Sequence, residues 1–245
     1  MAVGVFDVVE ASRLVIHGAS GRMGQALLRL CVAYPRLRLV ATVAGREPPT
    51  LAGVPGFRAT QIDALPAFDL CIDFSLPQAF DPVLACCVER GAALVSGTTG
   101  LDAGQMTRLE LAATRIALLW TANFSLGVAV LTDLVRRAAQ TLPDWQRDIV
   151  ESHHIHKQDA PSGTALALGR AVVEGGGAEP RYASLRAGDI VGEHLVQFTG
   201  LGERLELTHR ATDRDVFARG ALHCASRLAG CAPGRYGVLD LIKER

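Results

Sequence analysis

The first half of the sequence alternates short apolar runs with amphipathic stretches of helical length, and this alternation constrains the fold more than any other feature. The runs are largely hydrophobic at successive positions, and they read RLVIHGA, LRLVATVAG, FDLCIDFS, AALVSGTTG and IALLWTANFS. Strands that are apolar on both faces and separated by helices are typical of a parallel sheet covered on both sides. The pattern therefore predicts a Rossmann-type, doubly wound α/β domain, which binds ligands beyond the carboxyl ends of its strands.

After about residue 125 the continuous apolar runs give way to runs that alternate apolar and polar residues. HLVQFTG and ERLELTHRA show this alternation, which is typical of an antiparallel sheet with one exposed or partner-covered face. We therefore predict a second, α+β domain with a mainly antiparallel sheet. The expected division assigns residues 1–125 and 216–245 to the nucleotide-type domain and residues 126–215 to the second domain.

Composition limits the kinds of partner. Lys plus Arg equals Asp plus Glu at 25 each, so the chain lacks the cationic excess that nucleic acids and anionic membranes attract. The six cysteines include no C-x-x-C pair, as expected of buried thiols in a reducing compartment. The opening MAVGVFDVVEASR lacks the pattern of a secretory signal, and no apolar window approaches the length of a membrane span. We expect a cytoplasmic protein with neither a membrane nor a nucleic-acid partner.

A glycine-rich turn follows the first apolar run. VIHGASGRMGQALL spaces Gly18, Gly21 and Gly24 as G-x-x-G-x-x-G between a predicted strand and a predicted helix. Glycine permits a tight turn and lets the main chain approach a pyrophosphate, and the helix start offers free N–H groups. A turn without a ligand stays open as an alternative, but the position after the first strand favours a dinucleotide. The residues expected at the pyrophosphate are Gly18, Ala19, Ser20, Gly21, Arg22, Met23 and Gly24.

The end of the second predicted strand bears on the choice of cofactor. An acidic residue there would hold the ribose hydroxyls of NAD and repel the extra phosphate of NADP. VATVAGREPP places Ala44 and Gly45 at that point, followed by Arg46, whose guanidinium can pair with a phosphate. NADPH is therefore favoured, while Glu47 keeps NADH possible.

The segment ESHHIHKQDAPSGTALALG, residues 151–169, gathers three histidines and one of the few lysines. On a strand His153 points away from the face shared by His154 and His156, and Lys157 would repel a cation. We therefore expect no metal. In an acid/base site, a histidine titrates near neutral pH, and Lys157 can donate a proton or hold a carboxylate.

The start of the helix after this loop has the features of an anion site. Ser162 is a natural N-cap after Pro161, and Gly163 and Thr164 bring unpaired N–H groups to the first turn. The alternative, a capped surface helix with solvated histidines, stays open on the chemistry of this segment alone.

The pattern E-x-H-H-x-x-K-x-D-A-P-S-G-T-A resembles the signature of the 4-hydroxy-tetrahydrodipicolinate reductase family, also called the dihydrodipicolinate reductases. GASGRMG, IDFS-P, GTTG, ANFS-GV, RAGDIVGEH and GERLELTHRA followed by FARGA also occur in the order of that family, over nearly the whole chain. The resemblance implies reduction of a cyclic dicarboxylate by NAD(P)H with loss of water. The product is tetrahydrodipicolinate, in lysine and diaminopimelate biosynthesis.

The resemblance also implies residue roles. His153 would be the acid/base residue and Lys157 the proton donor, which also contacts substrate. His154, Ser162, Gly163 and Thr164 would line the dicarboxylate site. The nicotinamide side would be flanked by Gly97, Thr98 and Thr99, and by Ala122, Asn123, Phe124 and Ser125.

At the level of domains, the resemblance implies cofactor binding in the first domain, with substrate binding and oligomerisation in the second. Closure about hinges near 123–126 and 214–217 would bring the two together. The family is commonly homotetrameric through the sheet of the second domain.

The chain departs from the family pattern in two places. Only EGGGAEPRYASL stands before Arg186, where many members carry a longer stretch rich in Arg and Gly, and the acid after the second strand is missing. Three alternatives remain: a related nicotinamide-dependent oxidoreductase such as an aspartate dehydrogenase, a non-catalytic nucleotide-binding regulator, and a metal-dependent hydrolase.

Overall fold

The computed structural model describes residues 10–242, so the expectation about the N-terminal segment lies largely outside the described residues. The chain forms two compact units, one made of Met1–Ala122 with Phe217–Arg245 and the other of Asn123–Val216. Within the described range, no helix combines the length and the apolar character that a membrane span requires.

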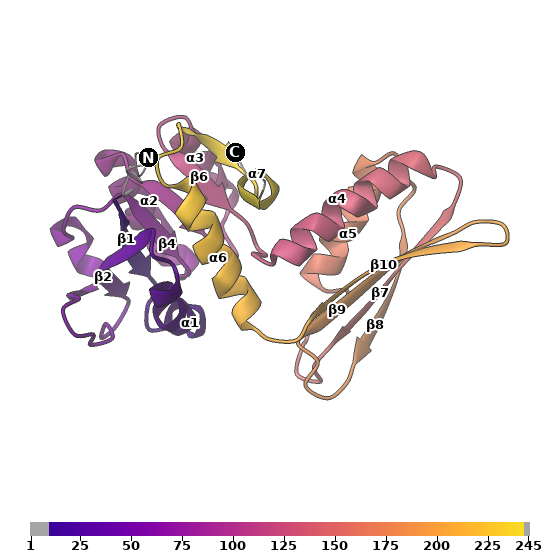
Figure 1. Ribbon diagram of the computed structural model, residues 1–245, viewed down its shortest axis with the longest axis horizontal. Coiled ribbons are helices and arrows are strands. Elements are labelled where there is room, and N and C mark those ends of the chain that lie inside the picture. Colours follow the sequence, from indigo (N-terminus) through magenta and orange to yellow (C-terminus); the bar gives the residue numbers. More distant parts are fainter. Residues whose placement is uncertain (1–9, 243–245) are drawn as a thin grey trace, which may run out of the picture. The chain divides into compact units, whose positions relative to one another are not determined.

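The first unit is built on a seven-stranded sheet with the order β11-β6-β5-β4-β1-β2-β3 in the described part of the chain (Figure 1). All its strand pairs are parallel. The chain runs outward from β1 to β3, then crosses back to β4 on the other side of β1. The strands are β1 (Ser12–His17), β2 (Leu37–Ala44), β3 (Gly56–Arg58), β4 (Leu70–Asp73), β5 (Ala93–Ser96), β6 (Ala117–Trp120) and β11 (Gly234–Tyr236).

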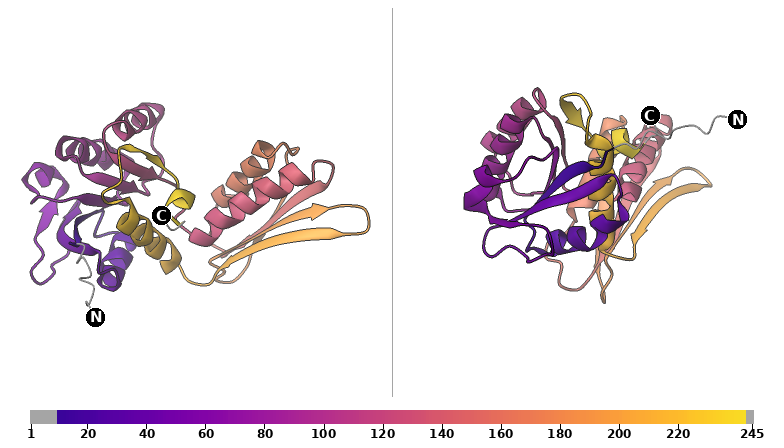
Figure 2. Two further views of the ribbon diagram at one scale, coloured as in Figure 1. Left: turned by 45° about the horizontal axis from the view of Figure 1, so that its top comes forward. Right: turned by 60° about the vertical axis from the view of Figure 1, so that its left-hand side comes forward.

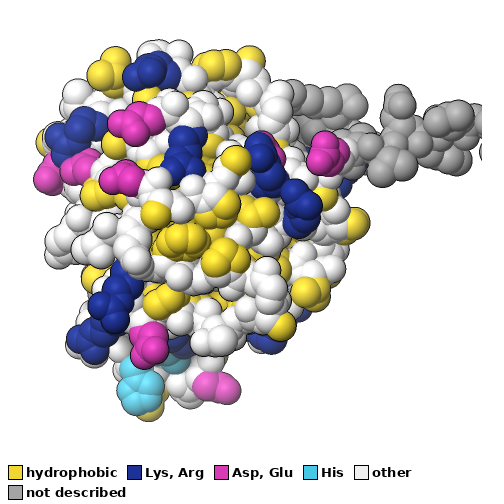
Figure 3. Space-filling model, turned by 90° about the vertical axis from the view of Figure 1, so that its left-hand side faces the viewer, with side chains coloured by type: hydrophobic (Ala, Val, Ile, Leu, Met, Phe, Trp, Pro, Cys, Tyr) yellow, Lys and Arg dark blue, Asp and Glu magenta, His cyan; other side chains and the backbone are white. Residues whose placement is uncertain are grey.

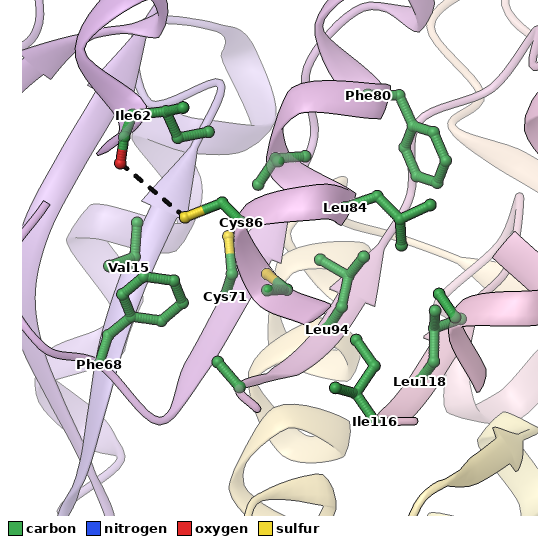
Figure 4. Close-up of a cluster of buried hydrophobic side chains, with 14 of the residues drawn as sticks. Val15, Ile62, Phe68, Cys71, Phe80, Leu84, Cys86, Leu94, Ile116 and Leu118 are labelled. Carbon is green, nitrogen blue, oxygen red and sulfur yellow. Dashed lines mark hydrogen bonds between the residues drawn. The ribbon is translucent and has the colours of Figure 1, made fainter. Parts of the chain in front are cut away.

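Helices cover both faces of this sheet (Figure 2). The helices of the first unit are α1 (Arg22–Leu30), α2 (Pro77–Arg90), α3 (Ala103–Ala113), α6 (Asp215–Leu228) and α7 (Val238–Ile242), with 3₁₀ turns η1 (Cys31–Ala33) and η2 (Ala59–Ala64). One apolar cluster joins α2, α3 and η2 to the sheet, with Phe80, Leu84 and Leu94 fully or nearly fully buried (Figure 4). Burial on both faces explains why these strands are apolar at successive positions.

The cysteines contribute to this core rather than to a bond or a metal site. None of the six forms a disulfide, and five of them are buried. In Figure 4, Cys71 and Cys86 lie among the apolar side chains, and the Cys86 thiol donates to the carbonyl of Ile62. Burial raises the pKa of Cys86, and burial likewise raises that of Cys224 to about 12. Thiols in such surroundings stay protonated and pack as small apolar groups.

The second unit packs two helices on one face of a four-stranded sheet with the order β10-β9-β7-β8 (Figure 1). Alternate residues of the central strands face the helices, among them Ile149, Val196 and Phe198, which are fully buried. The elements are α4 (Leu126–Thr141), β7 (Gln146–His153), α5 (Gly163–Glu174), β8 (Arg181–Arg186), β9 (Gly192–Thr199) and β10 (Arg204–Ala211).

The predicted fold class is confirmed, with one exception to the antiparallel pairing. β9 pairs antiparallel with β7 and β10, but β8 runs parallel to β7. The reason is that α5 lies between β7 and β8 in the chain, and a crossover through a helix returns the next strand in the same direction. Alternation of apolar and polar residues reports which face a residue occupies, and it does not report strand direction.

Charged side chains of both signs are mixed on the face shown in Figure 3, and neither sign forms a continuous patch there. This distribution accords with the formal net charge of zero.

Candidate active site

The glycine turn after β1 has a backbone that only glycine fits. Gly18 adopts a positive φ of 79°, and a Cβ there would lie 2.4 Å from the carbonyl oxygen of Phe74. A Cβ at Gly24, in the first turn of α1, would lie 2.3 Å from the carbonyl oxygen of Gly18. Gly21 is the N-cap of α1, so no side chain satisfies the first N–H groups of that helix. The turn therefore combines close main-chain approach with free donors, the combination that a phosphate requires.

The remaining residues predicted at the pyrophosphate divide by exposure. Ser20 and Arg22 are exposed, Met23 is half-buried and Ala19 is buried. Main-chain hydrogen bonds from Gly18 and Ala19 to Val43 tie the turn to β2. β2 ends at Ala44, and the exposed Arg46 follows two residues later. Arg46 is thus at the carboxyl end of β2, where the sequence predicts it.

A buried carboxylate beneath these turns was not predicted from the sequence. Asp73, the last residue of β4, is fully buried and accepts hydrogen bonds from Nδ1 of His17 at 2.8 Å and from the hydroxyls of Ser96 and Thr98 at 2.8 Å each. The backbone N–H of Ser75 donates to it as well. Burial opposes ionisation of Asp73, but these donors outweigh it and lower its pKa. Asp73 therefore joins the ends of three strands at the edge where ligands of such sheets bind.

The residues predicted on the nicotinamide side differ in what they expose. Thr99 and Ala122 are exposed, whereas the Thr98 side chain is buried on Asp73 and Phe124 is 1% exposed. A Cβ at Gly97 would lie 2.2 Å from the Phe74 ring, so Gly97 is required for packing. Any contact of Thr98 with a ligand must use its main chain.

Three of these residues, Asn123, Phe124 and Ser125, belong to the second unit, and the two polar ones make hydrogen bonds within it. Ser125 caps α4 by accepting from the N–H of Val128. The Asn123 side chain accepts from the Ser125 N–H at 2.8 Å and donates to Oγ1 of Thr164 at 3.0 Å. Asn123 thus connects the ANFS turn to the first turn of α5.

Glu151 and His153 form a buried pair at the carboxyl end of β7. His153 is 8% exposed and Glu151 is 1% exposed, and Nδ1 of His153 hydrogen-bonds Oε2 of Glu151. Arg186, at the end of the neighbouring β8, donates to both Glu151 oxygens, at 3.0 and 2.8 Å. Burial opposes ionisation of Glu151, but hydrogen bonds from Arg186, Ser184 and His153 outweigh it and lower its pKa to about 2.

A second histidine lies beside this pair. The rings of His153 and His194 stand edge to face, with centroids 5.2 Å apart. Burial and the neighbouring His153 lower the pKa of His194 to about 4, so His194 is neutral at neutral pH. Its Nε2 lies 3.1 Å from the Ser162 hydroxyl.

The loop after β7 carries the predicted lysine. Nζ of Lys157 donates to both carboxylate oxygens of Asp159, at 2.8 and 2.9 Å. The Asp159 side chain is 58% exposed and that of Lys157 is 22% exposed. His154 has a buried Nδ1 without a hydrogen-bond partner in the described part of the chain. Burial and Arg214 lower the pKa of His154.

The histidines of this loop do not converge. Nδ1 of His153 is occupied by Glu151, and the rings of His154 and His156 are 6.2 Å apart. Residues 10–242 contain no group of three or more His, Cys, Asp or Glu side chains arranged to hold a metal ion.

The first turn of α5 has the predicted cap. Ser162 accepts from the N–H of Ala165 at 3.1 Å, and its hydroxyl also contacts His194. Because the Ser162 side chain is 2% exposed, it shapes the helix start and is not free to bind a ligand. Gly163 is exposed, and a Cβ there would have nothing within 4 Å. The exposed carboxylate of Asp159 takes a hydrogen bond from the Gly163 N–H, so the N–H groups of this turn already face an anionic group, as the start of a helix favours.

The ionisation of Glu151 predicts a pH dependence of stability. Its pKa falls from an ordinary 4.5 to about 2 on folding, so ionised Glu151 stabilises the fold by about 3 kcal/mol above pH 4.5. This contribution is lost as the pH falls from 4.5 through about 2. The gap in unfolding free energy between the wild type and Glu151→Gln should therefore shrink between about pH 6 and about pH 3.

Urea unfolding followed by Trp145 fluorescence in a Trp120→Phe background would measure this gap, since Trp145 lies in the second unit. A gap that stays constant over that range would contradict the assignment of an ionised, stabilising Glu151.

The seven-stranded parallel sheet and the glycine turn after its first strand define a Rossmann-type α/β protein with an added α+β unit. Comparison with known proteins narrows this class to a family. Residues 12–124 match the family model described as dihydrodipicolinate reductase, N-terminus, and residues 127–242 match the one described as dihydrodipicolinate reductase, C-terminus. The chain belongs to the dihydrodipicolinate reductase family, and the resemblance found in its sequence motifs is confirmed.

Individual relatives agree with the family match. The chain is 66% identical over 234 residues to the 4-hydroxy-tetrahydrodipicolinate reductase of Stenotrophomonas maltophilia (strain K279a), covering 94% of this chain and 98% of that protein. It is 62% identical over 232 residues to the enzyme of the same name from Xylella fastidiosa (strain 9a5c), covering 94% and 98%. The solved structure of dipicolinate-bound dihydrodipicolinate reductase from Paenisporosarcina sp. TG-14 superposes with a TM-score of 0.82 at 22% identity, covering 95% of this chain and 100% of that one.

Proposed function

We propose that the chain reduces 4-hydroxy-tetrahydrodipicolinate to tetrahydrodipicolinate with a hydride from NADPH, as a step of lysine and diaminopimelate biosynthesis. The observation that carries the proposal is the carboxyl end of β7, where His153, Lys157 and the first turn of α5 follow one another. The exposed Asp159 carboxylate contacts both Lys157 and the Gly163 N–H, at the positions where we expect a substrate carboxylate to replace it. These groups suit a dicarboxylate that must also exchange protons. Family membership over nearly the whole described chain supports the choice of this substrate, because the relatives named above carry that activity in their names.

On the substrate side, cationic and N–H donors would hold the carboxylates. Lys157 would exchange its exposed partner Asp159 for a substrate carboxylate, at small cost because an exposed ion pair contributes little. The N–H groups of Gly163 and Thr164 would bind the other carboxylate at the start of α5. The unpartnered Nδ1 of His154 would gain a hydrogen bond to substrate, which removes a buried unsatisfied atom.

The reaction adds one hydride and one proton to the substrate and releases one water. Lys157 would supply the proton, because a lysine can lose one whereas an arginine remains charged at physiological pH. Only two of the 25 cationic residues are lysines, so a chain that otherwise uses arginine has a lysine at this position. His153 would exchange a proton through Nε2, the nitrogen that Glu151 does not occupy.

The first unit fits a dinucleotide, because the glycine turn has no room for Cβ atoms at Gly18 and Gly24 and α1 begins without a side-chain cap. Bound there, the dinucleotide supplies the hydride. The N–H groups of Arg22, Met23 and Gly24 would hold the pyrophosphate, with the exposed Ser20 and Arg22 side chains beside it. The main chain of Gly97, Thr98 and Thr99 and the 122–125 turn would flank the nicotinamide.

The preference for NADPH over NADH predicts a selective effect at Arg46. Arg46 is exposed two residues beyond β2, and its guanidinium would pair with the 2′-phosphate that only NADPH carries. Arg46→Ala should raise the KM for NADPH about 10-fold or more and leave that for NADH nearly unchanged. Steady-state kinetics with both cofactors measures this, and Arg36→Ala, at an exposed arginine before β2, is the matched control. Equal effects on both cofactors would remove the phosphate role.

The open face of the second sheet is the surface we assign to the homotetramer expected of the family. Helices cover the other face, and Val150 and Leu195 are directly paired on the open one, next to Leu185, which is 57% exposed. An exposed apolar stripe on a sheet is typical of a protein interface. A monomeric mass in solution would contradict this assignment.

The compartment we propose is the cytoplasm, where six thiols that form no disulfide remain reduced. The proposed partners are the cyclic dicarboxylate substrate and the nicotinamide cofactor, with no metal.

One assay separates this function from its rivals. The purified protein is mixed with substrate made in situ by the preceding synthase, and the absorbance of NADPH or NADH is followed. Cofactor oxidation that depends on the synthase supports the proposal. Oxidation of NAD(P)H by an imino acid, or reduction of NAD(P)⁺ by the matching amino acid, would favour an aspartate dehydrogenase-like enzyme. No turnover with any substrate would favour a regulator. Loss of activity with chelators would favour the metal-dependent hydrolase.

A further inference from the structure

Glu151 is a buried carboxylate to which the roles above assign nothing. Its side chain is completely buried, and four N–H groups converge on it, together with the Ser184 hydroxyl. Oε1 accepts from Arg186 at 2.8 Å and from the Ser162 N–H at 3.3 Å, and Oε2 accepts from Arg186 at 3.0 Å and from Nδ1 of His153. A carboxylate so completely hydrogen-bonded fixes the side chains around it.

We propose that Glu151, held in place by Arg186, is the positioning residue that keeps the proton of neutral His153 on Nδ1 and leaves Nε2 as the nitrogen that meets the substrate. The proposal rests on the acid/base role proposed for His153. It adds that Glu151 determines which ring nitrogen of His153 reacts.

The selection follows from what each group can do. The Arg186 guanidinium and the Ser162 N–H can only donate, so they require oxygen lone pairs and accept nothing in return. Among these nitrogen partners, His153 is the one that can either donate or accept at the contacting atom. The Ser184 hydroxyl can also do both, and beside the ionised carboxylate it donates. Because the other contacts hold Glu151 as an acceptor, Nδ1 of His153 must carry the hydrogen, and Nε2 then has the free lone pair.

A glycine on the adjacent strand lies beside Nε2 of His153. A Cβ at Gly192, the first residue of β9, would lie 3.1 Å from this nitrogen, and no residue of the described range hydrogen-bonds it. The absence of a side chain at Gly192 therefore leaves room beside the nitrogen that Glu151 leaves free.

The other charged and titratable neighbours do not compete for this role. His194 on β9 packs edge to face against His153, is neutral at neutral pH and is hydrogen-bonded to Ser162. On the loop, Lys157 pairs with Asp159, and Arg186 on β8 binds Glu151 itself. Glu151 is the group that bonds His153 directly.

The first test measures the tautomer without using activity. Two-bond ¹H–¹⁵N spectra of histidine-labelled protein at about pH 8, above the ordinary histidine pKa, distinguish the two neutral tautomers, and His153→Gln identifies the His153 signals by their loss. We expect His153 protonated on Nδ1. A neutral His153 protonated on Nε2 in the wild type would overturn the proposal, and this result needs no variant of Glu151 to fold.

The second test uses Glu151→Gln, whose amide has one acceptor oxygen instead of two. Oε1 serves two obligate donors and Oε2 serves only one, so the amide oxygen should take the Oε1 position and the NH₂ group should face His153. Nδ1 would then accept, and the proton would move to Nε2. We expect the tautomer to switch and kcat to fall about 10²–10⁴-fold, as when an amide replaces the acid behind a catalytic histidine, with unchanged Kd for NADPH.

Glu174→Gln is the matched control, since Glu174 pairs with Arg136 at the exposed end of α5 and should change neither tautomer nor kcat. A Glu151→Gln protein that keeps the Nδ1 tautomer, or that switches it with kcat unchanged, would overturn the proposal. Absence of reductase activity in the wild type would instead defeat the proposed function, and the tautomer of His153 would still be decided by the spectra.

Discussion

Lys157→Ala is expected to lower kcat about 10²–10⁴-fold while leaving the Kd for NADPH within about 2-fold. The loss reflects two functions of one side chain: its ammonium attracts a carboxylate and is the proton source proposed for the reaction. Lys157 lies in the loop after β7, and its present partner Asp159 is largely exposed, so the ammonium is free to exchange partners. The glycine turn proposed to bind the cofactor belongs to the first unit, which is why NADPH affinity should not change.

Lys157→Arg separates the two functions. An arginine keeps the positive charge but cannot give up a proton at physiological pH. We expect this variant to retain a substrate KM near that of the wild type and to lose kcat almost as fully as the alanine variant. Steady-state kinetics gives kcat and KM, and quenching of tryptophan fluorescence gives the NADPH affinity. If Lys157→Ala lowered the affinity for NADPH and left kcat unchanged, Lys157 would contact the cofactor and not the substrate, which would contradict the proposed role.

Asp73→Ala is expected to cost the first unit about 3 kcal/mol or more of unfolding free energy, because each buried partner left without its acceptor costs about 1–3 kcal/mol. The change leaves His17, Ser96 and Thr98 without their shared acceptor in a site where Asp73 is 0% exposed. Because His17 and Thr98 adjoin the cofactor turns, the affinity for NADPH should fall as well. Asp73→Asn keeps the shape and one acceptor oxygen, so it should lose less stability.

Trp120 reports on this region, since its ring N–H donates to the carbonyl of Thr98 at 2.8 Å. Urea unfolding followed by Trp120 fluorescence in a Trp145→Phe background measures the loss, with Asp63→Asn as the control at an exposed aspartate. A loss at Asp73→Ala no larger than that of Asp63→Asn would show that the network under the turns contributes nothing to stability.

The fold was largely predictable because the burial of a strand determines the pattern of apolar residues in its sequence. Strands covered on both faces are apolar at every position, and strands covered on one face are apolar at every second position. Gly18, Gly21 and Gly24 were identifiable because their spacing serves a local purpose, the turn between β1 and α1. The direction of β8 was not predictable, because side-chain alternation is the same in parallel and antiparallel strands.

The site was predictable where its residues are neighbours in sequence and not where they meet through the sheet. Lys157, Ser162 and Gly163 lie on one short loop and helix start. Glu151 and Arg186 are 35 positions apart, and they meet because β7 and β8 pair in the register that sets His153 opposite Arg186.

One signal was nevertheless present in the sequence. Residues two apart on a strand share a face, so the E-x-H spacing already placed Glu151 beside His153. His17 and Asp73 end adjacent parallel strands, which by itself brings their side chains to one edge of the sheet.

In the proposed function, this chain transfers a hydride from NADPH to the cyclic dicarboxylate. The direct test incubates the purified protein with synthase-generated substrate and NADPH deuterated at both C4 positions, and weighs the product by mass spectrometry. If the proposed function is correct, the product is tetrahydrodipicolinate that carries one added deuterium, and it accumulates at the rate at which NADPH is oxidised. Product without deuterium, or NADPH oxidation without this product, would contradict it.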